Sequence, residues 1–250
     1  MGWRVPFLVS IALVAFGLFI RLRIMESPVF AQIKETRSEV KIPVVELFRG
    51  DLKNVLLAAG LYLAHGVIFY ALTVYTVAYT TSRFGIAENR YLIGVSAAAA
   101  LQIFLVPFFG RLSDHLGRRP VITFGTIFIT VFAVPLYFMI NSQVTVLAWL
   151  AVMIGIGIGH SAVYGPTAAF YTELFPARVR YSGASISYQL GGAIAGFVPL
   201  IATSMVGAAG GAFWPIPMLI AIAALIGLLC VTLATRAREE EPVAEPATSS

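Results

Sequence analysis

Charged side chains are scarce in this sequence. Only 12% of the 250 residues are Asp, Glu, Lys or Arg, whereas about a quarter of a soluble domain is charged. Apolar residues make up 59%, and the mean hydropathy is +0.88. So little charge excludes an ordinary soluble domain, and lipid must solvate most of the chain. The net charge of +5 comes from basic residues that lie between apolar stretches and form no continuous patch, which excludes nucleic acid as a partner.

Cysteine is nearly missing as well. The single cysteine, Cys230, lies inside an apolar run, so the sequence offers no disulfide framework and no cysteine-based metal cluster. It also shows no nucleophile paired with a base and no phosphate-binding loop next to a strand. We therefore expect no enzymatic activity, no bound metal and no cofactor.

Carboxylates are absent from the middle of every long apolar stretch. Ionisable groups inside a membrane are costly and are kept where they bind protons, ions or substrates. His65 and His160 lie deep in two of the apolar stretches, and a histidine gains or loses a proton near neutral pH. One hypothesis is that they relay protons or bind substrate. The alternative is a neutral imidazole that hydrogen-bonds to a neighbouring helix.

Long apolar stretches dominate what is present. A transmembrane helix needs about 20 mainly apolar residues. Seven stretches meet this requirement, at approximately 4–22, 54–80, 91–110, 120–140, 144–168, 183–206 and 215–234. The first is no signal peptide, because basic residues follow it and no cleavage site of small residues is present. The sequence therefore predicts an all-α integral membrane protein with seven transmembrane helices.

Basic residues predict the orientation of these spans. If the spans alternate in direction, all of the 17 Lys and Arg residues except Arg4, Arg83 and Arg90 face one side of the membrane. Short loops that face the cytoplasm collect Lys and Arg. We therefore expect a protein of the plasma (cytoplasmic) membrane whose N-terminus is outside and whose C-terminus is in the cytoplasm.

Residues 110–120 form the most informative motif, Gly-Arg-Leu-Ser-Asp-His-Leu-Gly-Arg-Arg-Pro. The motif predicts a short polar turn between two antiparallel helices, with Asp114 in reach of several arginines. In one interpretation, the acid and the arginines form charge-assisted bonds that close the cytoplasmic side and break when it opens. The alternative is a positive loop that only sets topology. We favour the first, because topology requires the arginines but not the Asp-x-x-Gly spacing.

This predicted cytoplasmic latch extends to a second polar segment, between the fifth and sixth apolar stretches. There Glu173 lies close in sequence to two arginines, so a similar pairing is expected at the cytoplasmic ends of these spans. The complete set of latch residues is Gly110, Asp114, Gly117, Arg118, Arg119, Glu173, Arg178 and Arg180.

The motif resembles the G-x-x-x-D-x-x-G-R-R/K loop of the major facilitator superfamily, which occurs between spans two and three and again between spans eight and nine. Two longer stretches narrow the resemblance to the metabolite:proton symporter branch. Residues 3–30, beginning Trp-Arg-Val-Pro-Phe-Leu, look like span six and its exit, and residues 164–183 are similar to the junction of spans ten and eleven. The resemblance covers the chain up to about residue 235 and identifies it as the portion from about span six onward.

The resemblance also implies a domain organisation. Residues 1–22 would be the last span of an N-terminal bundle, 23–53 a cytoplasmic loop between bundles, 54–234 a C-terminal six-helix bundle and 235–250 a disordered cytoplasmic tail. Two such bundles rock about a central site in secondary transporters. We therefore expect uptake of a small organic metabolite together with a proton. The missing N-terminal bundle or a dimer mate would be needed for function.

Polar residues in the middle of the apolar stretches are the candidates for a substrate cavity. Tyr62, His65, Phe69, Thr73 and Thr76 recur at helical spacing and predict a polar and aromatic stripe that faces a cavity or another helix. Hydrogen bonds that only join helices are the alternative role. The cavity candidates are Tyr62, His65, Thr73, Gln102, His160, Tyr164 and Gln189.

Other functional classes also fit seven spans. A retinal protein needs a lysine in its last span, whereas Lys34, Lys41 and Lys53 all lie in the first long connection. The latch motif disfavours a seven-span receptor. A truncated fragment that does not transport is the remaining alternative, because the span at 4–22 would lack its bundle partners.

Overall fold

The computed structural model describes residues 4–23, 47, 50–177 and 179–234. The chain divides into two compact units, Met1–Lys41 and Ile42–Ser250, and we describe each by itself. Every regular element in the described ranges is a helix, which confirms the predicted all-α class. Most of the predicted connection at 23–53, the predicted tail at 235–250 and the latch candidate Arg178 lie outside the described residues.

The first unit contains helix α1, Val5–Arg23, which is 19 residues long. It corresponds to the predicted span at 4–22, and its apolar part is Ser10–Ile20. No acidic residue occurs in its first turn, and its sequence is apolar up to the arginines near its end.

The second unit contains six helices in the described residues that are long and apolar enough to cross a membrane. Three of them are continuous α-helices: α6 (Glu88–Leu116), α7 (Arg118–Asn141) and α12 (Pro215–Leu233). The others are composite. The first consists of α4 (Leu52–Tyr70), η2 (Ala71–Tyr75) and α5 (Thr76–Phe84). The second consists of α8 (Thr145–Val152), η3 (Met153–His160) and α9 (Ser161–Leu174). The third consists of α10 (Arg180–Gly196) and α11 (Val198–Ala208). Together with α1 they give the seven predicted transmembrane helices.

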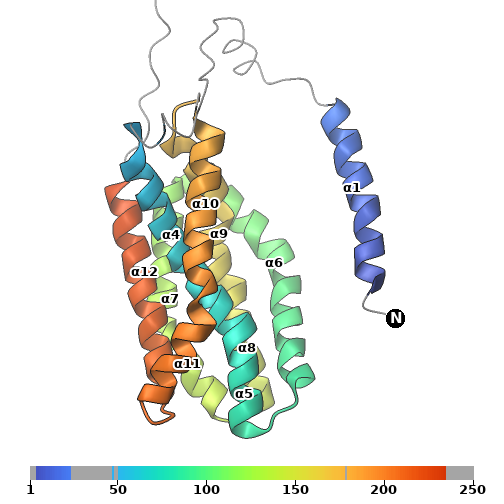
Figure 1. Cartoon of the computed structure of the whole chain (residues 1–250), viewed down its shortest axis with the longest axis vertical. Helices are drawn as coiled ribbons and strands as arrows, with labels where there is room; N and C mark the ends of the chain where they lie inside the picture. Colours follow the sequence, from blue (N-terminus) through green and yellow to red (C-terminus); the bar gives the residue numbers. More distant parts are fainter. Residues whose placement is uncertain (1–3, 24–46, 48–49, 178, 235–250) are drawn as a thin grey trace, which may run out of the picture. The chain divides into compact units, whose positions relative to one another are not determined.

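Helix α4 is the inner helix of this six-helix unit. It packs against α10 and α12, while α7 packs against α12 and α9, and α6 packs against η3 and α9 (Figure 1). In the span that begins with α4, 67% of the apolar window is buried, compared with 17% in α6 and 22% in the span of α10 and α11. The last two therefore lie at the perimeter of the unit.

Two spans contain a π-helical segment, η2 and η3. A π turn bonds one residue further along the chain than an α turn, so the helix faces before and after it are out of register. Just after η2, the buried Thr76 hydroxyl donates to the carbonyl oxygen of Ala71 at 2.7 Å and lies 2.8 Å from the Tyr137 hydroxyl. The predicted stripe therefore faces the cavity up to Phe69 and another helix, α7, at Thr76. Thr73 faces neither in the contacts described, since its hydroxyl donates back to the Phe69 carbonyl oxygen at 2.7 Å.

Helix α6 continues through most of the 110–120 motif. Residues 110–116 form its last turns and α7 begins at Arg118, so the predicted turn over 110–120 is wrong in length. Gly117 alone connects the two helices, with φ 93° and ψ 154°, a conformation that residues with a side chain rarely adopt. Polarity marks where a span leaves the lipid, and here the helix continues beyond that point.

Candidate functional site

A cavity of about 390 Å³ lies beside α4 at mid-length of the six-helix unit. His65, Gln102 and His160, which line it, each lie near the midpoint of their membrane-length helix. The lining residues are Tyr62, His65, Gly66 and Phe69 of α4, Ala99, Gln102, Ile103 and Val106 of α6, His160 of η3, Tyr164 of α9 and Tyr188 of α10. No Asp, Glu, Lys or Arg is among these described lining residues, so any fixed charge in the cavity must come from a histidine or from a ligand.

His65 is buried in the cavity wall, with 2% of its surface exposed. Its ring centroid lies 4.5 Å from that of Tyr62, 5.4 Å from that of His160 and 5.5 Å from that of Tyr164. Within the part of the chain that the structure describes, its Nε2 atom has no hydrogen-bond partner. Buried polar atoms are nearly always hydrogen-bonded, so an unpaired one in a cavity wall points to a bound partner.

His160 is held by Gln102. The side-chain nitrogen of Gln102 lies 2.7 Å from Nδ1 of His160 and 3.4 Å from the carbonyl oxygen of Ile156. A carbonyl oxygen only accepts hydrogen bonds, so the Ile156 contact identifies the amide nitrogen of Gln102 as the atom facing this side. Gln102 therefore donates to Nδ1 of His160, and the neutral imidazole carries its own proton on Nε2.

Aromatic rings form much of the remaining wall. The ring of His160 is stacked on that of Tyr164, with centroids 5.2 Å apart and planes at 18°, and lies 5.3 Å from the ring of Phe69. Tyr62 and Tyr188 meet edge to face at 4.7 Å. Such rings offer apolar surface and faces that attract cations, while the tyrosine hydroxyls add hydrogen-bonding groups.

The structure brings together five of the seven predicted cavity residues, namely Tyr62, His65, Gln102, His160 and Tyr164. Thr73, within η2, does not line the cavity. Gln189 is exposed on α10 and does not line the cavity; its neighbour Tyr188 does.

The sequence prediction named Gln189 as a cavity residue and did not include its neighbour Tyr188, which lines the cavity. Glycine spacing would have identified the correct face of α10. Gly191 and Gly192 both pack against Tyr62, and they follow Tyr188 by three and four residues, which places all of them on one helix face.

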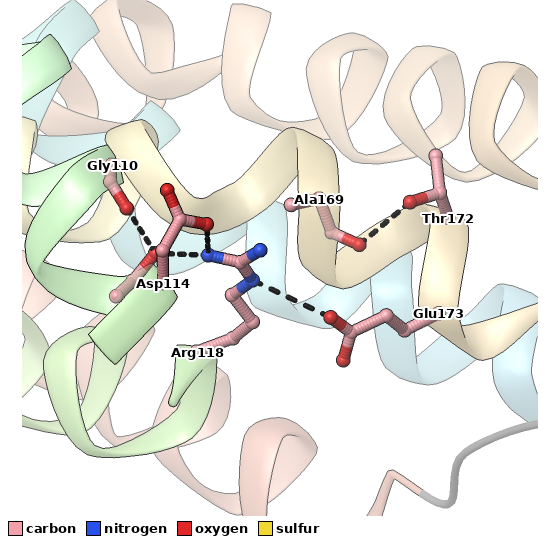
Figure 2. Close-up of polar contacts among 7 residues, drawn as sticks. Gly110, Asp114, Arg118, Ala169, Thr172 and Glu173 are labelled. Carbon is pink, nitrogen blue, oxygen red and sulfur yellow. Dashed lines mark hydrogen bonds and ion pairs between the residues drawn. The ribbon is translucent and has the colours of Figure 1, made fainter. Parts of the chain in front are cut away.

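At one end of the unit, Arg118 joins α6, α7 and α9 (Figure 2). It forms an ion pair with Asp114, donates from Nη1 to the Ser113 hydroxyl at 2.9 Å, and donates from Nε to Oε1 of Glu173 at 3.4 Å. The Ser113 hydroxyl in turn donates to the carbonyl oxygen of Gly110 at 2.6 Å. We call Ser113, Asp114, Arg118 and Glu173 the Arg118 network.

The other predicted latch residues have different partners. Arg119 donates to the carbonyl oxygen of Ala234, at the end of α12, and Arg180 donates from Nε to the carbonyl oxygen of Phe175 at 3.2 Å. Both contacts tie helix ends together. The pairing of Glu173 with Arg118 was not predicted, since 55 residues separate them in sequence.

The Arg118 network is accessible to water. The exposed fractions of the Arg118, Asp114 and Glu173 side chains are 20%, 55% and 31%. Ion pairs with this exposure contribute about 0–1 kcal/mol each. The network can therefore form and break without unfolding the bundle.

Comparison with known proteins connects these features to a family. The family profile of the Major Facilitator Superfamily matches residues 1–198. The chain belongs to the major facilitator superfamily. No solved structure matches the chain.

Three curated relatives illustrate the family. The chain is 33% identical over 206 residues to the inner membrane metabolite transport protein YhjE of Escherichia coli (strain K12), covering 79% of this chain and 47% of YhjE. It is 30% identical over 237 residues to the glycine betaine/proline/ectoine/pipecolic acid transporter OusA of Dickeya dadantii (strain 3937), covering 91% and 47%. It is 31% identical over 209 residues to the shikimate transporter of Escherichia coli (strain K12), covering 82% and 48%.

The major facilitator relatives confirm the predicted family. They are transporters and not enzymes, and the six membrane-length helices together with α1 make the chain an integral membrane protein. The chain spans about half the length of the curated relatives it matches.

Proposed function

We propose that this chain forms the C-terminal portion of a proton-coupled secondary transporter that takes up a small, carboxylate-bearing metabolite by rocker-switch alternating access. The cavity at mid-length of the bundle is the observation that carries this proposal. Secondary transporters bind substrate near the bilayer midplane, between two bundles that rock against each other. In this chain, hydrogen-bonding and aromatic side chains gather at that depth.

The names of the relatives support the substrate class. OusA is named for glycine betaine, proline, ectoine and pipecolic acid, and another relative is named for shikimate. These compounds differ in ring and charge, but each carries one carboxylate at neutral pH. A cavity of about 390 Å³ suits molecules of this size.

The exposed rim of the cavity supports a second bundle. Tyr164 and Tyr188 are 39% and 37% exposed at mid-length of the unit, where hydrocarbon offers their hydroxyls no partner. Polar groups at this depth face protein or a water-filled cavity rather than lipid. We propose that the N-terminal bundle of a complete transporter covers this rim, with residues 1–22 as its last span and 23–53 as the connection. A dimer mate in the same position is the alternative.

The Arg118 network supports a role at the cytoplasmic end. We propose that this end faces the cytoplasm in an inner membrane, with the N-terminus outside, because most basic residues belong to that side. Because α6, α7 and α9 belong to one bundle, rocking of two bundles alone leaves this contact in place. We propose that opening toward the cytoplasm also shifts α9 relative to α6 and α7 and so breaks the bond between Glu173 and Arg118. The weak, exposed ion pairs suit such a reversible contact.

The test is transport by the protein purified from its native membrane through a C-terminal affinity tag. Reconstituted into vesicles with an acidic exterior, it is expected to take up glycine betaine, proline or shikimate, and a protonophore is expected to stop accumulation. Intact mass then shows whether the transporting unit is a longer chain or an assembly. Uptake without any effect of the pH gradient would overturn the proton coupling alone.

A matched pair of variants tests the cavity. Tyr188→Ala removes a ring from the cavity wall, and we expect uptake to fall by roughly tenfold because a ring contact contributes about 0.5–1.5 kcal/mol beyond its buried area. Phe197→Ala, at a residue that is 60% exposed and does not line the cavity, is the control. Equal uptake by both variants would contradict the cavity as the substrate site.

A further inference from the structure

The two cavity histidines lie in unequal surroundings, although their rings are only 5.4 Å apart. Gln102 donates a hydrogen bond to Nδ1 of His160 at 2.7 Å. Protonation of that nitrogen would set two donors against each other, unless the Gln102 amide turned over and lost its contact with the Ile156 carbonyl oxygen. Gln102 therefore disfavours protonation of His160.

His65 has no such restraint. Its Nε2 atom is buried and has no hydrogen-bond partner among the described residues, and the ring lines the cavity. The imidazolium form would direct an N–H donor to a ligand in the cavity. Of the two histidines, His65 is the one whose unpaired nitrogen can take up a proton and donate to a ligand in the cavity.

In the described part of the chain, the other ionisable groups around His65 do not supply a negative counter-charge. Tyr62 of its own helix, His160 of η3, Tyr164 of α9 and Tyr188 of α10 face it around the cavity. The remaining elements packed against α4 carry these ionisable side chains nearby: Cys230 of α12, next to Gly60, and Tyr137 of α7, which bonds to Thr76. Tyr75 lies in η2. Helix α11 carries no ionisable side chain. None of these residues is an Asp, Glu, Lys or Arg, and no carboxylate lines the cavity among the residues that the structure describes.

An imidazolium in the empty cavity would thus be a buried charge without a partner, which is strongly unfavourable. A ligand carboxylate changes this balance, because it supplies both the opposite charge and an acceptor for the N–H groups. The short separation from His160 also disfavours two charged rings, so a single proton is taken up by the pair.

We propose that His65 binds one proton together with the carboxylate of the substrate, while His160 stays neutral and only positions Gln102 and Tyr164. The proton comes from water and adds to the lone pair of the imidazole, and no covalent bond of the ligand breaks. When the ligand leaves, the imidazolium loses its counter-charge and releases the proton. This inference rests on the proposed substrate class and names the group at which proton and substrate binding are linked.

Calorimetric titration of the whole protein in lipid nanodiscs tests the proposal. Titrations in buffers with different ionisation enthalpies measure the net protons taken up for each ligand bound. Three probes of similar shape separate the charges: glycine betaine has both, 3,3-dimethylbutanoate has only the carboxylate, and choline has only the trimethylammonium group. We expect the two carboxylates to bind with proton uptake and choline to bind without it. Above the pH at which free His65 is neutral, the Kd of the carboxylates should rise about tenfold per pH unit.

Two variants locate the proton. His65→Gln should abolish proton uptake and remove the pH dependence of the Kd, whereas His160→Gln should retain both. The proposal is overturned if choline binds with the same proton uptake, or if His160→Gln loses the uptake and His65→Gln keeps it. If a variant does not fold, the comparison of the three probes on the unaltered protein decides. Binding of the carboxylates without proton uptake overturns this inference alone; no binding of any probe overturns the proposed substrate class as well.

Discussion

Replacing Gly165 with alanine tests how closely α6 and α9 must approach beside the cavity. A Cβ atom at Gly165 would lie 2.7 Å from the carbonyl oxygen of Val106 and 3.1 Å from the amide nitrogen of Gly110. Both are backbone atoms of α6, so no side-chain rotation can relieve the overlap. The two helices must separate by a few tenths of an ångström.

The expected cost follows from two opposing effects. Overpacking of this kind destabilises by about 1–3 kcal/mol. Alanine is about 1 kcal/mol better than glycine inside a helix. Gly165→Ala should therefore lower the free energy of unfolding by up to about 2 kcal/mol, which for a chain of this size lowers Tm by up to about 8 °C.

Gly110→Ala is the matched control on the other side of the same contact. Its Cβ would meet only the carbonyl oxygen of Gly165, at 3.8 Å, which is an ordinary van der Waals distance. We expect this variant to be as stable as the unaltered protein or slightly more so. Thermal unfolding of the detergent-solubilised protein compares the three, and equal Tm values for the two variants would refute the close approach of α6 and α9.

Two further predictions concern hydrogen bonds. Arg118→Lys should slow transport several-fold, because the lysine ammonium lacks the planar guanidinium that holds Asp114 and Glu173 together. Its Tm should change by less than about 2 °C, because exposed ion pairs add little stability. An unchanged transport rate would count against the latch. Gln102→Leu removes the donor to His160, so ¹⁵N NMR of histidine-labelled protein should show a shift of its tautomer population. An unchanged ¹⁵N spectrum would contradict the assigned direction of this hydrogen bond.

Much of the fold could be predicted from the sequence, because lipid imposes one simple requirement on it. Each span must be long and apolar, so composition alone located all seven helices to within a few residues at most ends. The error at residues 110–120 has a clear cause. Polarity shows where the lipid ends, whereas Gly117 is the point at which backbone geometry ends the helix.

The candidate site was harder to predict, because it depends on which way each helix faces. Tyr62 and His65 line the same cavity, as their spacing within one regular helix predicts for two residues on one face. The same spacing failed at Thr73, because a π turn has no sequence pattern that composition reveals. The contact between Arg118 and Glu173 depends on how α9 packs against the end of α6, which neither local segment specifies.

The π turn η2 gives a single span two separate tasks. Before it, α4 presents His65 and Phe69 to the cavity; after it, α5 turns Thr76 and Tyr79 to α7, where the Tyr79 hydroxyl donates to Asn141 at 2.8 Å. Substitutions of the cavity-lining residues before the π turn and of the α7-facing residues after it should therefore differ in phenotype. The first set should alter ligand binding, and the second should alter how much folded protein reaches the membrane. A mutational scan along residues 52–84 would separate the two sets.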